Sequence, residues 1–251
     1  LLSLYADSHR LTLMLACQND QTKSGKPFDK NLKKKAATMA VKVAIIGLGI
    51  MGQRMLTNMR LHQNFEPDYL WDPDESACHQ AMILDPQSKI MNSANDAISK
   101  ADLVYLACPP AVREPYALAA AETGKALFLE KPFGINFDDS AKLMARLQAH
   151  NVPVAVNFTQ ASGAALTDLL AAKDRGEMGD LLGVDIIVTY PAWPRQWQKG
   201  ADWLRFRAEG GMTREVISHF LFFTERVLGP LSLISAHTTY PDDPHLCETA
   251  V

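Results

Sequence analysis

A glycine-rich turn between an apolar run and an amphipathic stretch is the feature that most constrains this fold. The turn, Gly47-Leu48-Gly49-Ile50-Met51-Gly52, directly follows the apolar run Val43–Ile46. Between a strand and a helix, the first glycine permits the tight turn, the second admits a pyrophosphate, and the third lets helix and strand pack closely. The free N–H groups of the helix favour phosphate charge. We therefore expect residues 47, 49, 50, 51 and 52 to bind a dinucleotide; a glycine turn without a ligand is the alternative.

Short apolar runs alternate with longer amphipathic stretches up to residue 157. The runs typical of buried strands are Val43–Ile46, Asp68–Trp71, Leu103–Ala107, Ala126–Leu129 and Val152–Asn157. Helical spacing covers Ile50–Leu61, Pro110–Glu122 and Phe137–His150. Such alternation predicts right-handed β-α-β units. The expected fold class is therefore α/β, with a doubly wound parallel Rossmann sheet as a dinucleotide-binding domain at residues 40–157.

The pattern changes after residue 157. Helical spacing covers Ala161–Arg175 and Thr213–Leu228, strand patterns cover Leu182–Tyr190 and Leu231–Thr239, and a loop runs from Pro191 to Arg207. We expect residues 158–251 to form an incomplete α+β domain for substrate binding and dimerisation. A sheet of two or three strands covers its helices poorly. We therefore interpret the chain as truncated at its C-terminus.

Residues 1–39 differ in charge from the rest of the chain. They carry seven basic and three acidic side chains, whereas the whole chain of 251 residues has a net charge of −3. Their middle part cannot bury enough apolar surface to become ordered. We interpret 1–39 as a disordered or non-native extension, with Met39 as the natural start. The alternative is a lipoprotein-like export signal, in which Arg10 precedes the short run LTLMLA and then Cys17.

The composition excludes several classes of function. With 25 Lys+Arg against 28 Asp+Glu, the charge gives no reason to expect nucleic acid. No apolar run reaches the roughly eighteen residues of a membrane span. The four cysteines lie far apart and form no C-x-x-C pair. We therefore expect no disulfide framework and no metal site, and a cytoplasmic location.

Asp72 ends the expected strand Asp68–Trp71 and lies 20 residues after Gly52. A carboxylate at this point accepts hydrogen bonds from ribose hydroxyls and repels a 2′-phosphate. The next three residues contain no basic side chain that could bind such a phosphate. The position therefore predicts NAD rather than NADP. The alternative is that Asp72 only caps the next helix.

Glu130-Lys131-Pro132 follows the expected strand Ala126–Leu129, so Lys131 lies where parallel sheets bind ligands. Together with AIIGLGIMG and the turn Cys108-Pro109-Pro110, the stretch ETGKALFLEKPFG resembles the Gfo/Idh/MocA family of oxidoreductases. The resemblance covers residues 41 to the end. It implies that Lys131 lies beside nicotinamide and substrate, with Cys108, Pro109 and Glu130 also at the cofactor. It also implies a homo-oligomer for the full-length protein, because the family's second sheet often forms the dimer interface.

The family has a second catalytic element, an aspartate four residues before a histidine on a helix that follows glycines. The matching stretch is EGGMTREVISHF, in which Glu215 replaces the usual aspartate and Ser218 the usual glycine. The spacing places Glu215 and His219 on one helical face. The resemblance implies that His219 is the general base and that Glu215 orients it or stabilises its charge. Without the resemblance, a surface salt bridge is the usual interpretation.

The loop from Pro191 to Arg207 is rich in side chains that stack on sugars and bind anions. We expect the substrate to contact Lys131, Arg195, Trp197, Arg214 and His219. Packing at a domain or dimer interface is the alternative role of this loop.

These features predict an NAD-dependent oxidoreductase that transfers a hydride between nicotinamide and a hydroxyl or carbonyl group. The expected substrate is a sugar, a cyclitol or a related small molecule. Two alternatives from other classes are a glycosidase that uses bound NAD for transient oxidation and a non-catalytic NAD-binding regulatory protein.

Overall fold

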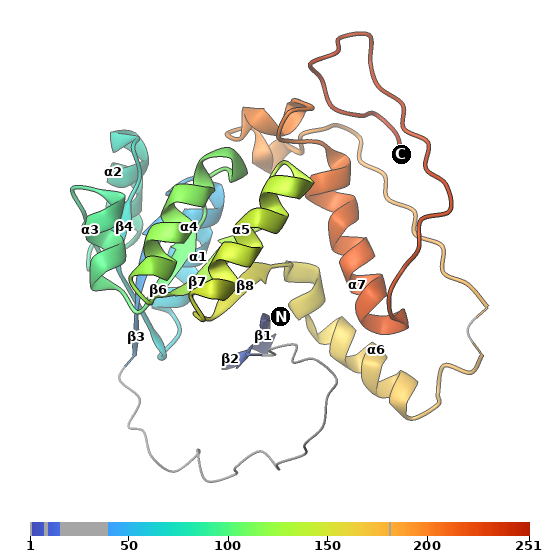
Figure 1. Cartoon of the computed structure of the whole chain (residues 1–251), viewed down its shortest axis with the longest axis horizontal. Coiled ribbons are helices and arrows are strands. Elements are labelled where there is room, and N and C mark those ends of the chain that lie inside the picture. Colours follow the sequence, from blue (N-terminus) through green and yellow to red (C-terminus); the bar gives the residue numbers. More distant parts are fainter. Residues whose placement is uncertain (1, 8–9, 16–39, 181) are drawn as a thin grey trace.

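A parallel sheet with helices on both faces forms the body of the chain (Figure 1). The computed structural model describes residues 2–7, 10–15, 40–180 and 182–251. The strand order is β5-β4-β3-β6-β7-β8. The strands are β3 (Val41–Ile46), β4 (Phe65–Trp71), β5 (Lys89–Ile90), β6 (Leu103–Leu106), β7 (Ala126–Glu130) and β8 (Val154–Asn157). All neighbours pair in parallel, which confirms the predicted Rossmann arrangement.

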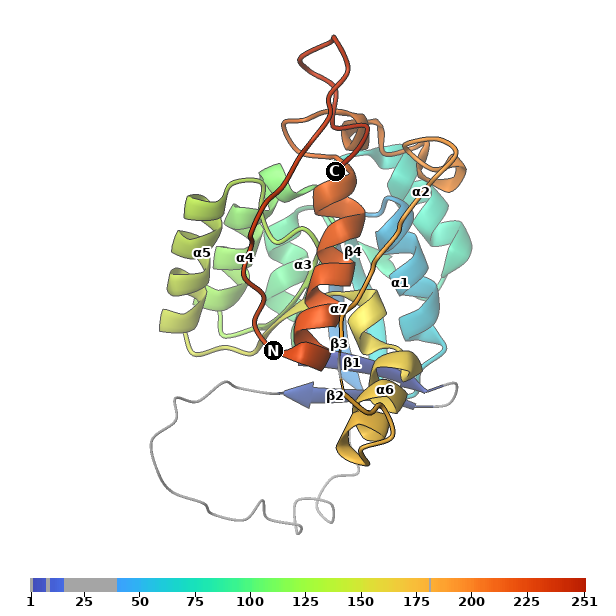
Figure 2. The same cartoon turned by 90° about the vertical axis from the view of Figure 1, so that its right-hand side faces the viewer.

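The central strands are apolar along their length because both faces of the sheet are covered. The residues from Val43 to Ile46 in β3 are fully buried. On one face lie α3 (Ala94–Lys100), α4 (Arg113–Glu122) and α5 (Phe137–Ala149), and on the other lie α1 (Ile50–Arg60) and α2 (Glu75–Leu84). Figure 2 shows these two groups on opposite sides of the sheet. The sequence analysis missed α2, α3 and the two-residue strand β5.

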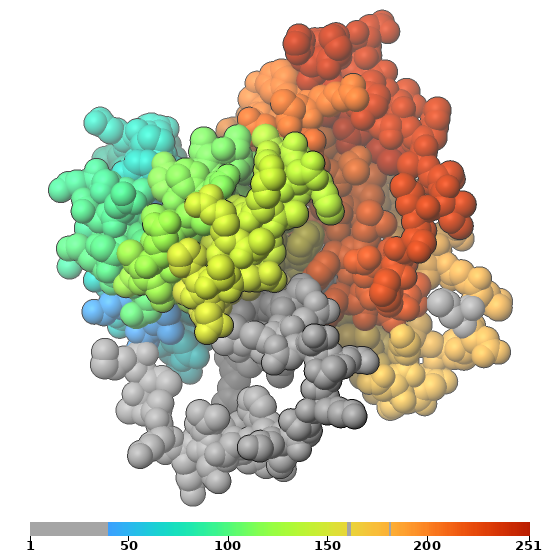
Figure 3. All heavy atoms as spheres, in the orientation of Figure 1, coloured from blue at the N-terminus to red at the C-terminus, as the bar shows by residue number. Residues whose placement is uncertain are grey.

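Two further helices, α6 (Ala164–Asp174) and α7 (Ser218–Leu228), pack against each other beyond the sheet. The short helical turn η3 (Thr159–Ser162) precedes α6, and the turns η4 (Gln196–Gln198) and η5 (Asp202–Arg205) lie between α6 and α7 in the sequence. The π-helical turn η6 (Thr213–Ile217) leads directly into α7. Figure 3 shows the residues beyond about 190, in orange and red, gathered beside the dinucleotide-binding domain. None of the helices in the described ranges is long and apolar enough to cross a membrane.

The prediction of two strands in this second region is wrong. Residues 182–190 form no strand, and the segment Leu231–Thr239 pairs only at its end, where Thr239 N donates to Ala250 O (2.9 Å). A strand needs a partner for its backbone groups. The two segments run on either side of α7 instead of side by side (Figure 2). Their apolar side chains are consequently exposed, Leu182 and Ile234 to 98% each.

Two short strands lie in the N-terminal region, where the sequence analysis expected no regular structure. β1 (Leu2–Asp7) and β2 (Arg10–Leu15) pair in antiparallel register. Both alternate apolar and other residues with period two, which suits a hairpin. The remainder of the expected extension, residues 16–39, lies outside the described residues, as does the part of the export-signal alternative that contains Cys17.

Candidate active site

The glycine turn joins β3 to α1 at the carboxyl edge of the sheet. Gly47 has φ +97°, and a Cβ there would lie 2.5 Å from Cys108 N. A Cβ on Gly52 would lie 1.9 Å from Gly47 O, so this glycine permits the close contact of helix and strand. A Cβ on Gly49 would meet no atom within 4 Å. The open space at Gly49, in front of the N-terminus of α1, is where a pyrophosphate fits.

Asp72 follows β4 and lies against the glycine turn. Its Oδ2 accepts a hydrogen bond from Leu48 N (2.6 Å), and its Oδ1 accepts one from Asp74 N (2.9 Å). Asp74, not Asp72, caps α2 by accepting from Ser76 N (2.9 Å). The capping alternative for Asp72 is therefore incorrect. Its carboxylate lines the pocket and keeps further lone pairs for a ribose hydroxyl.

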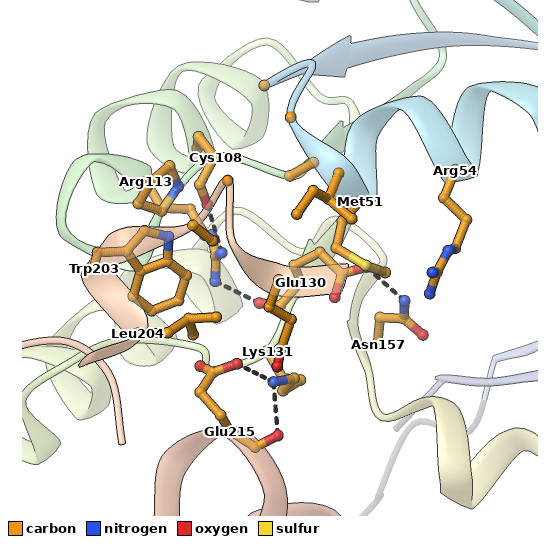
Figure 4. Close-up of a pocket in the computed structure, with 18 of the residues that line it drawn as sticks. Met51, Arg54, Cys108, Arg113, Glu130, Lys131, Asn157, Trp203, Leu204 and Glu215 are labelled. Atoms are coloured by element: carbon orange, nitrogen blue, oxygen red, sulfur yellow. Dashed lines mark hydrogen bonds and ion pairs between the residues drawn. The ribbon is translucent and has the colours of Figure 1, made fainter. Parts of the chain in front are cut away.

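Arg113, which begins α4, holds two loops of the site together. Its guanidinium is 2% exposed and donates to Cys108 O (2.7 Å) and to the carbonyl oxygens of Glu130 and Pro132. It therefore links the turn after β6 to the loop after β7 (Figure 4). Nothing in the local sequence shows that an arginine at this position faces inward.

Glu130 ends β7 inside a small polar network. Its Oε1 accepts hydrogen bonds from Tyr105 Oη and from Asn157 Nδ2, the latter at 2.6 Å. All three side chains are buried, and Asn157 ends the neighbouring strand β8. Burial and the adjacent charge of Glu130 raise the pKa of Tyr105, so its hydroxyl stays a donor. The network fixes the carboxylate directly before Lys131.

Lys131 and Glu215 form an ion pair across the pocket (Figure 4). The ammonium of Lys131 donates to Glu215 Oε2 and to Glu215 O, the second at 3.0 Å. An ammonium has three N–H donors, so one remains for a bound molecule. The predicted carboxylate therefore contacts the lysine, and no hydrogen bond joins it to His219 among the described residues. This corrects the expectation that Glu215 orients the histidine directly.

His219 lies in the first turn of α7, buried at 7% exposure. Its ring packs edge-on against Phe158, with centroids 5.6 Å apart. Its Nδ1 and the Oε1 of Glu215 are buried without a hydrogen-bond partner in the described structure. Buried polar atoms without partners are uncommon in native proteins. Here they lie in the pocket that also contains the ammonium of Lys131, as expected for groups that a ligand satisfies.

Burial shifts the pKa values of His219 and Glu215 in opposite directions. Burial, together with the positive charges of Lys131 and Arg195, lowers the pKa of His219 to about 4. Burial raises the pKa of Glu215, although the ion pair with Lys131 opposes the change. At neutral pH His219 is therefore neutral and can accept a proton.

Aromatic rings surround Arg195 in the loop that covers the pocket. Its guanidinium carbon lies 4.8 Å from the ring centroid of Trp197, 5.0 Å from Tyr190 and 5.8 Å from Trp193. Its Nε donates to Gln198 Oε1 (2.9 Å). Arg54 of α1 also packs on Trp197, at 5.1 Å, which connects the loop to the dinucleotide-binding domain.

The segment near residue 248 caps the element that carries Glu215. Oε1 of Glu248 accepts a hydrogen bond from Thr213 N (2.6 Å) at the start of η6. Gly211 has φ +106°, and a Cβ there would lie 2.6 Å from Glu248 Oε2. The glycine is thus needed both for its backbone conformation and for the approach of this carboxylate. Sequence reasoning missed Glu248.

One pocket of about 550 Å³ brings most of the predicted residues together. Those that line it are Gly47, Gly49, Ile50, Met51, Asp72, Cys108, Pro109, Glu130, Lys131, Arg195, Trp197, Glu215 and His219. Gly52 lies beneath the glycine turn and serves packing. Arg214 was predicted at the substrate but is not part of the lining. Its guanidinium donates instead to Arg207 O (2.8 Å) and Gly210 O (3.1 Å), because it lies on the outward side of η6.

The pocket also contains residues that the sequence analysis did not single out. Among them are Arg54, Tyr116, Tyr190 and Gln198. Of these residues, only Arg54 could have been predicted from the sequence, because it lies two positions after the last glycine of the turn. Among the described residues, no group of three or more His, Cys, Asp and Glu side chains could hold a metal ion.

The sheet order, the glycine turn and the carboxylate after β4 together define a dinucleotide-binding protein of the Rossmann type. Residues 41–158 match the GFO_IDH_MocA family, described as an oxidoreductase family with an NAD-binding Rossmann fold. The match covers the dinucleotide-binding domain.

Curated relatives are similar over part of their length. An uncharacterized oxidoreductase of Streptococcus pneumoniae serotype 4 is 23% identical over 173 residues, 68% of this chain and 46% of the relative. The dTDP-3,4-didehydro-2,6-dideoxy-alpha-D-glucose 3-reductase of Streptomyces violaceoruber is 28% identical over 130 residues, 51% of this chain and 36% of the relative. The chain thus spans less than half the length of these two proteins.

A solved structure shares the fold. Scyllo-inositol dehydrogenase from Lactobacillus casei, with bound NAD(H) and scyllo-inositol, matches with a TM-score of 0.64 at 18% identity. The match covers 76% of this chain and 57% of that one. At this identity the similarity establishes the fold.

Proposed function

We propose that the protein is an NAD-dependent oxidoreductase that transfers a hydride between nicotinamide and a hydroxyl or carbonyl group of a sugar or cyclitol. One observation carries the proposal: a single pocket joins an open glycine turn to the ion pair of Lys131 with Glu215 and to a neutral, buried His219. Relatives named for a dideoxyglucose derivative and an inositol support the substrate class.

The residues at the glycine turn fit a dinucleotide. The space in front of Gly49 and the N-terminus of α1 accept the pyrophosphate, and Asp72 accepts from the ribose hydroxyls. Bound nicotinamide supplies the ring carbon that accepts or donates the hydride.

Residues of this chain then transfer the proton and stabilise the charge on the substrate oxygen. In the oxidative direction, the neutral ring of His219 takes the proton of the substrate hydroxyl. The free N–H of Lys131 donates to the same oxygen and stabilises its developing negative charge. Glu215 holds the ammonium group of Lys131 in position through two hydrogen bonds. The rings and guanidinium group of the covering loop hold the rest of the substrate and reduce its contact with water.

We further propose NAD as the preferred form of the cofactor. Asp72 supports this preference, because its charge opposes a 2′-phosphate and residues 73–75 offer no basic side chain. Titration of the protein with NADH and NADPH, followed by nicotinamide fluorescence, tests it. Asp72→Ala should narrow the preference, and a wild-type protein that binds NADPH tenfold more tightly would contradict it.

The oxidoreductase proposal is tested by the net formation of NADH over a panel of sugars, cyclitols and their ketones. Net NADH from at least one polyol supports it. Cleavage of a glycoside without net NADH would favour the glycosidase alternative, in which bound NAD is oxidised and reduced within one turnover. NADH binding without turnover of any member would favour a regulatory role. Cell fractionation tests the cytoplasmic location that we propose from the cysteine spacing.

A further inference from the structure

Arg195, together with Arg54, is one of two cations of the pocket that have no anionic or carbonyl partner among the described residues. The positively charged side chains of the lining are Arg54, Arg113, Lys131 and Arg195. Arg113 donates to three carbonyl oxygens, and Lys131 is paired with Glu215. Only Gln198, through a neutral amide oxygen, accepts from the guanidinium of Arg195.

None of the three carboxylates of the pocket forms an ion pair with Arg195 among the described residues. Asp72 accepts from two backbone N–H groups. Glu130 accepts from a tyrosine and an asparagine, and Glu215 accepts from Lys131. The guanidinium of Arg195 is therefore a half-buried positive charge without a counter-ion in this part of the chain. A cation of this kind is stabilised when a ligand brings the opposite charge.

The surroundings of Arg195 fix its position in advance. Three aromatic rings lie within 5.8 Å of its guanidinium carbon, and Gln198 holds its Nε at 2.9 Å. Stacking leaves the edge of the planar group, with its outer N–H donors, available for two parallel hydrogen bonds. Carboxylate and phosphate oxygens match that geometry, whereas a sugar hydroxyl offers neither two acceptors nor a charge.

Arg195 belongs to the substrate side of the pocket. It lies in the loop that covers the pocket and shares the pocket lining with Lys131 and His219, and its charge contributes to the lowered pKa of His219. Arg54 lies on α1 directly after the glycine turn, where a cation suits the pyrophosphate of a dinucleotide. With Arg54 assigned to the cofactor, Arg195 is the cation left for the molecule whose hydroxyl reaches His219.

We infer that the substrate of this site is an acidic sugar or cyclitol, whose carboxylate or phosphate group pairs with the guanidinium of Arg195. The inference rests on the proposed function and names the class of substrate. A carboxylate and a phosphate share this chemistry, so the test must contain both.

The experiment measures binding to the NADH-saturated protein by calorimetry and by tryptophan fluorescence, since Trp197 and Trp203 line the pocket. The ligands are matched sets: glucose, glucuronate and glucose 6-phosphate, with the galactose and mannose equivalents. We expect at least one acidic member to bind about 10- to 100-fold more tightly than its neutral parent, the range of a charged hydrogen bond. The uronates and the phosphates distinguish the two sources of charge. Equal affinity of acidic and neutral members, or no binding of either, overturns the inference.

Arg195→Gln should reduce the preference to less than about threefold while leaving the affinity for NADH unchanged. The matched control is Arg205→Gln in the same loop, whose guanidinium pairs with Asp202 (3.4 Å) at the surface; it should keep the preference. Arg195→Lys keeps the positive charge but loses the paired N–H donors of the guanidinium, so it should keep part of the preference for acidic ligands. An Arg195→Gln variant that retains the preference, or that loses NADH affinity instead, assigns the side chain to packing or to the cofactor and overturns the inference. The wild-type comparison needs no variant, so the inference stays testable even if Arg195→Gln does not fold.

The experiment separates this inference from the proposed function. Oxidation of neutral polyols with net NADH formation, without a preference for acidic ones, would leave the oxidoreductase standing and remove the acidic substrate. Failure to bind NADH at all would remove both.

Discussion

At the scale of single residues, the site depends on how three titratable groups are paired. Lys131 and Glu215 form an ion pair, and burial together with the charges of Lys131 and Arg195 lowers the pKa of His219 to about 4. The histidine is therefore neutral over the physiological range, as a general base requires. The sequence predicted that Glu215 acts on His219, whereas in the structure Glu215 contacts Lys131.

We predict that Lys131→Ala and His219→Ala each lower kcat by about 10²- to 10⁴-fold, the usual contribution of a positioned acid or base. The affinity for NADH should change little, because the glycine turn and Asp72 are untouched. Steady-state rates and NADH titration measure the two quantities. A variant that kept half of the wild-type kcat would exclude that residue from the chemistry.

The low pKa of His219 predicts a pH profile without the acid limb of an ordinary histidine. Since its pKa is about 4, the neutral form persists as the pH falls through 6.5, and kcat/KM should stay level from pH 8 to about 5. Arg195→Gln removes one of the charges that depress this pKa, so its acid limb should move to higher pH. The same measurement on Arg205→Gln is the control. A wild-type limb near pH 6.5 would contradict the assignment.

At the scale of elements, the site is built where the ends of strands meet the starts of helices. β3 delivers the glycine turn, β4 delivers Asp72, and β7 delivers Glu130 and Lys131. Parallel strands place all these ends at one edge of the sheet. Arg113, at the start of α4, then ties two of the connecting loops together.

Substitutions at two glycines of the turn should affect cofactor binding and folding separately. Gly49→Ala adds a methyl group only to the open pocket, so the melting temperature should hold while NADH affinity falls by about tenfold or more. Gly47→Ala forces a side chain into a backbone with φ +97° and against Cys108 N, and should destabilise the fold by about 1–3 kcal/mol or more. Thermal melts and NADH titrations of both variants measure this. Equal loss of stability in the two would contradict the separation.

Arg113→Met should lower the free energy of unfolding by about 3 kcal/mol or more, because three buried carbonyl groups lose a charged donor. The rate should fall as well, since Pro132 and Glu130 flank Lys131. The matched control is Arg146→Met, which breaks an exposed ion pair with Glu114 (3.0 Å) and should cost less than about 1 kcal/mol. Urea unfolding compares the two variants. Similar losses of unfolding free energy would show that Arg113 does not hold the two loops together.

At the scale of the whole molecule, a complete dinucleotide-binding domain carries a second region with few partners of its own. α6 and α7 pack on each other, whereas the extended segments at 182–190 and 231–239 expose their apolar side chains. Leu182, Ile187, Leu233 and Ile234 are between 83% and 98% exposed. Exposed apolar residues in this number are typical of surfaces that another chain or segment covers.

We therefore predict that the protein self-associates in solution, as the family resemblance also implies. Light scattering coupled to size-exclusion chromatography should give a mass of at least two chains at micromolar concentration. Ile187→Lys and Ile234→Lys should shift the distribution toward the monomer, whereas Leu61→Lys, at an exposed position in the dinucleotide-binding domain, should not. A monomeric wild-type protein would contradict the prediction.

The sequence by itself determined what depends on local spacing. Alternating apolar runs predicted the parallel sheet, and the glycines, Asp72 and Lys131 were found because their positions relative to strand ends follow from general rules. The predicted strands after residue 181 failed because a strand exists only where another backbone accepts its hydrogen bonds, and apolar alternation cannot supply that partner.

Only the tertiary structure decided how the side chains pair. It joined Glu215 to Lys131 across 84 positions of the chain, turned Arg113 inward and Arg214 outward, and brought Glu248 to Thr213. Such contacts join residues far apart in the sequence, and their energies depend on burial and distance. Residue type alone indicates that an arginine is charged. Which atoms surround it, and whether a counter-ion is among them, is decided by the folded chain.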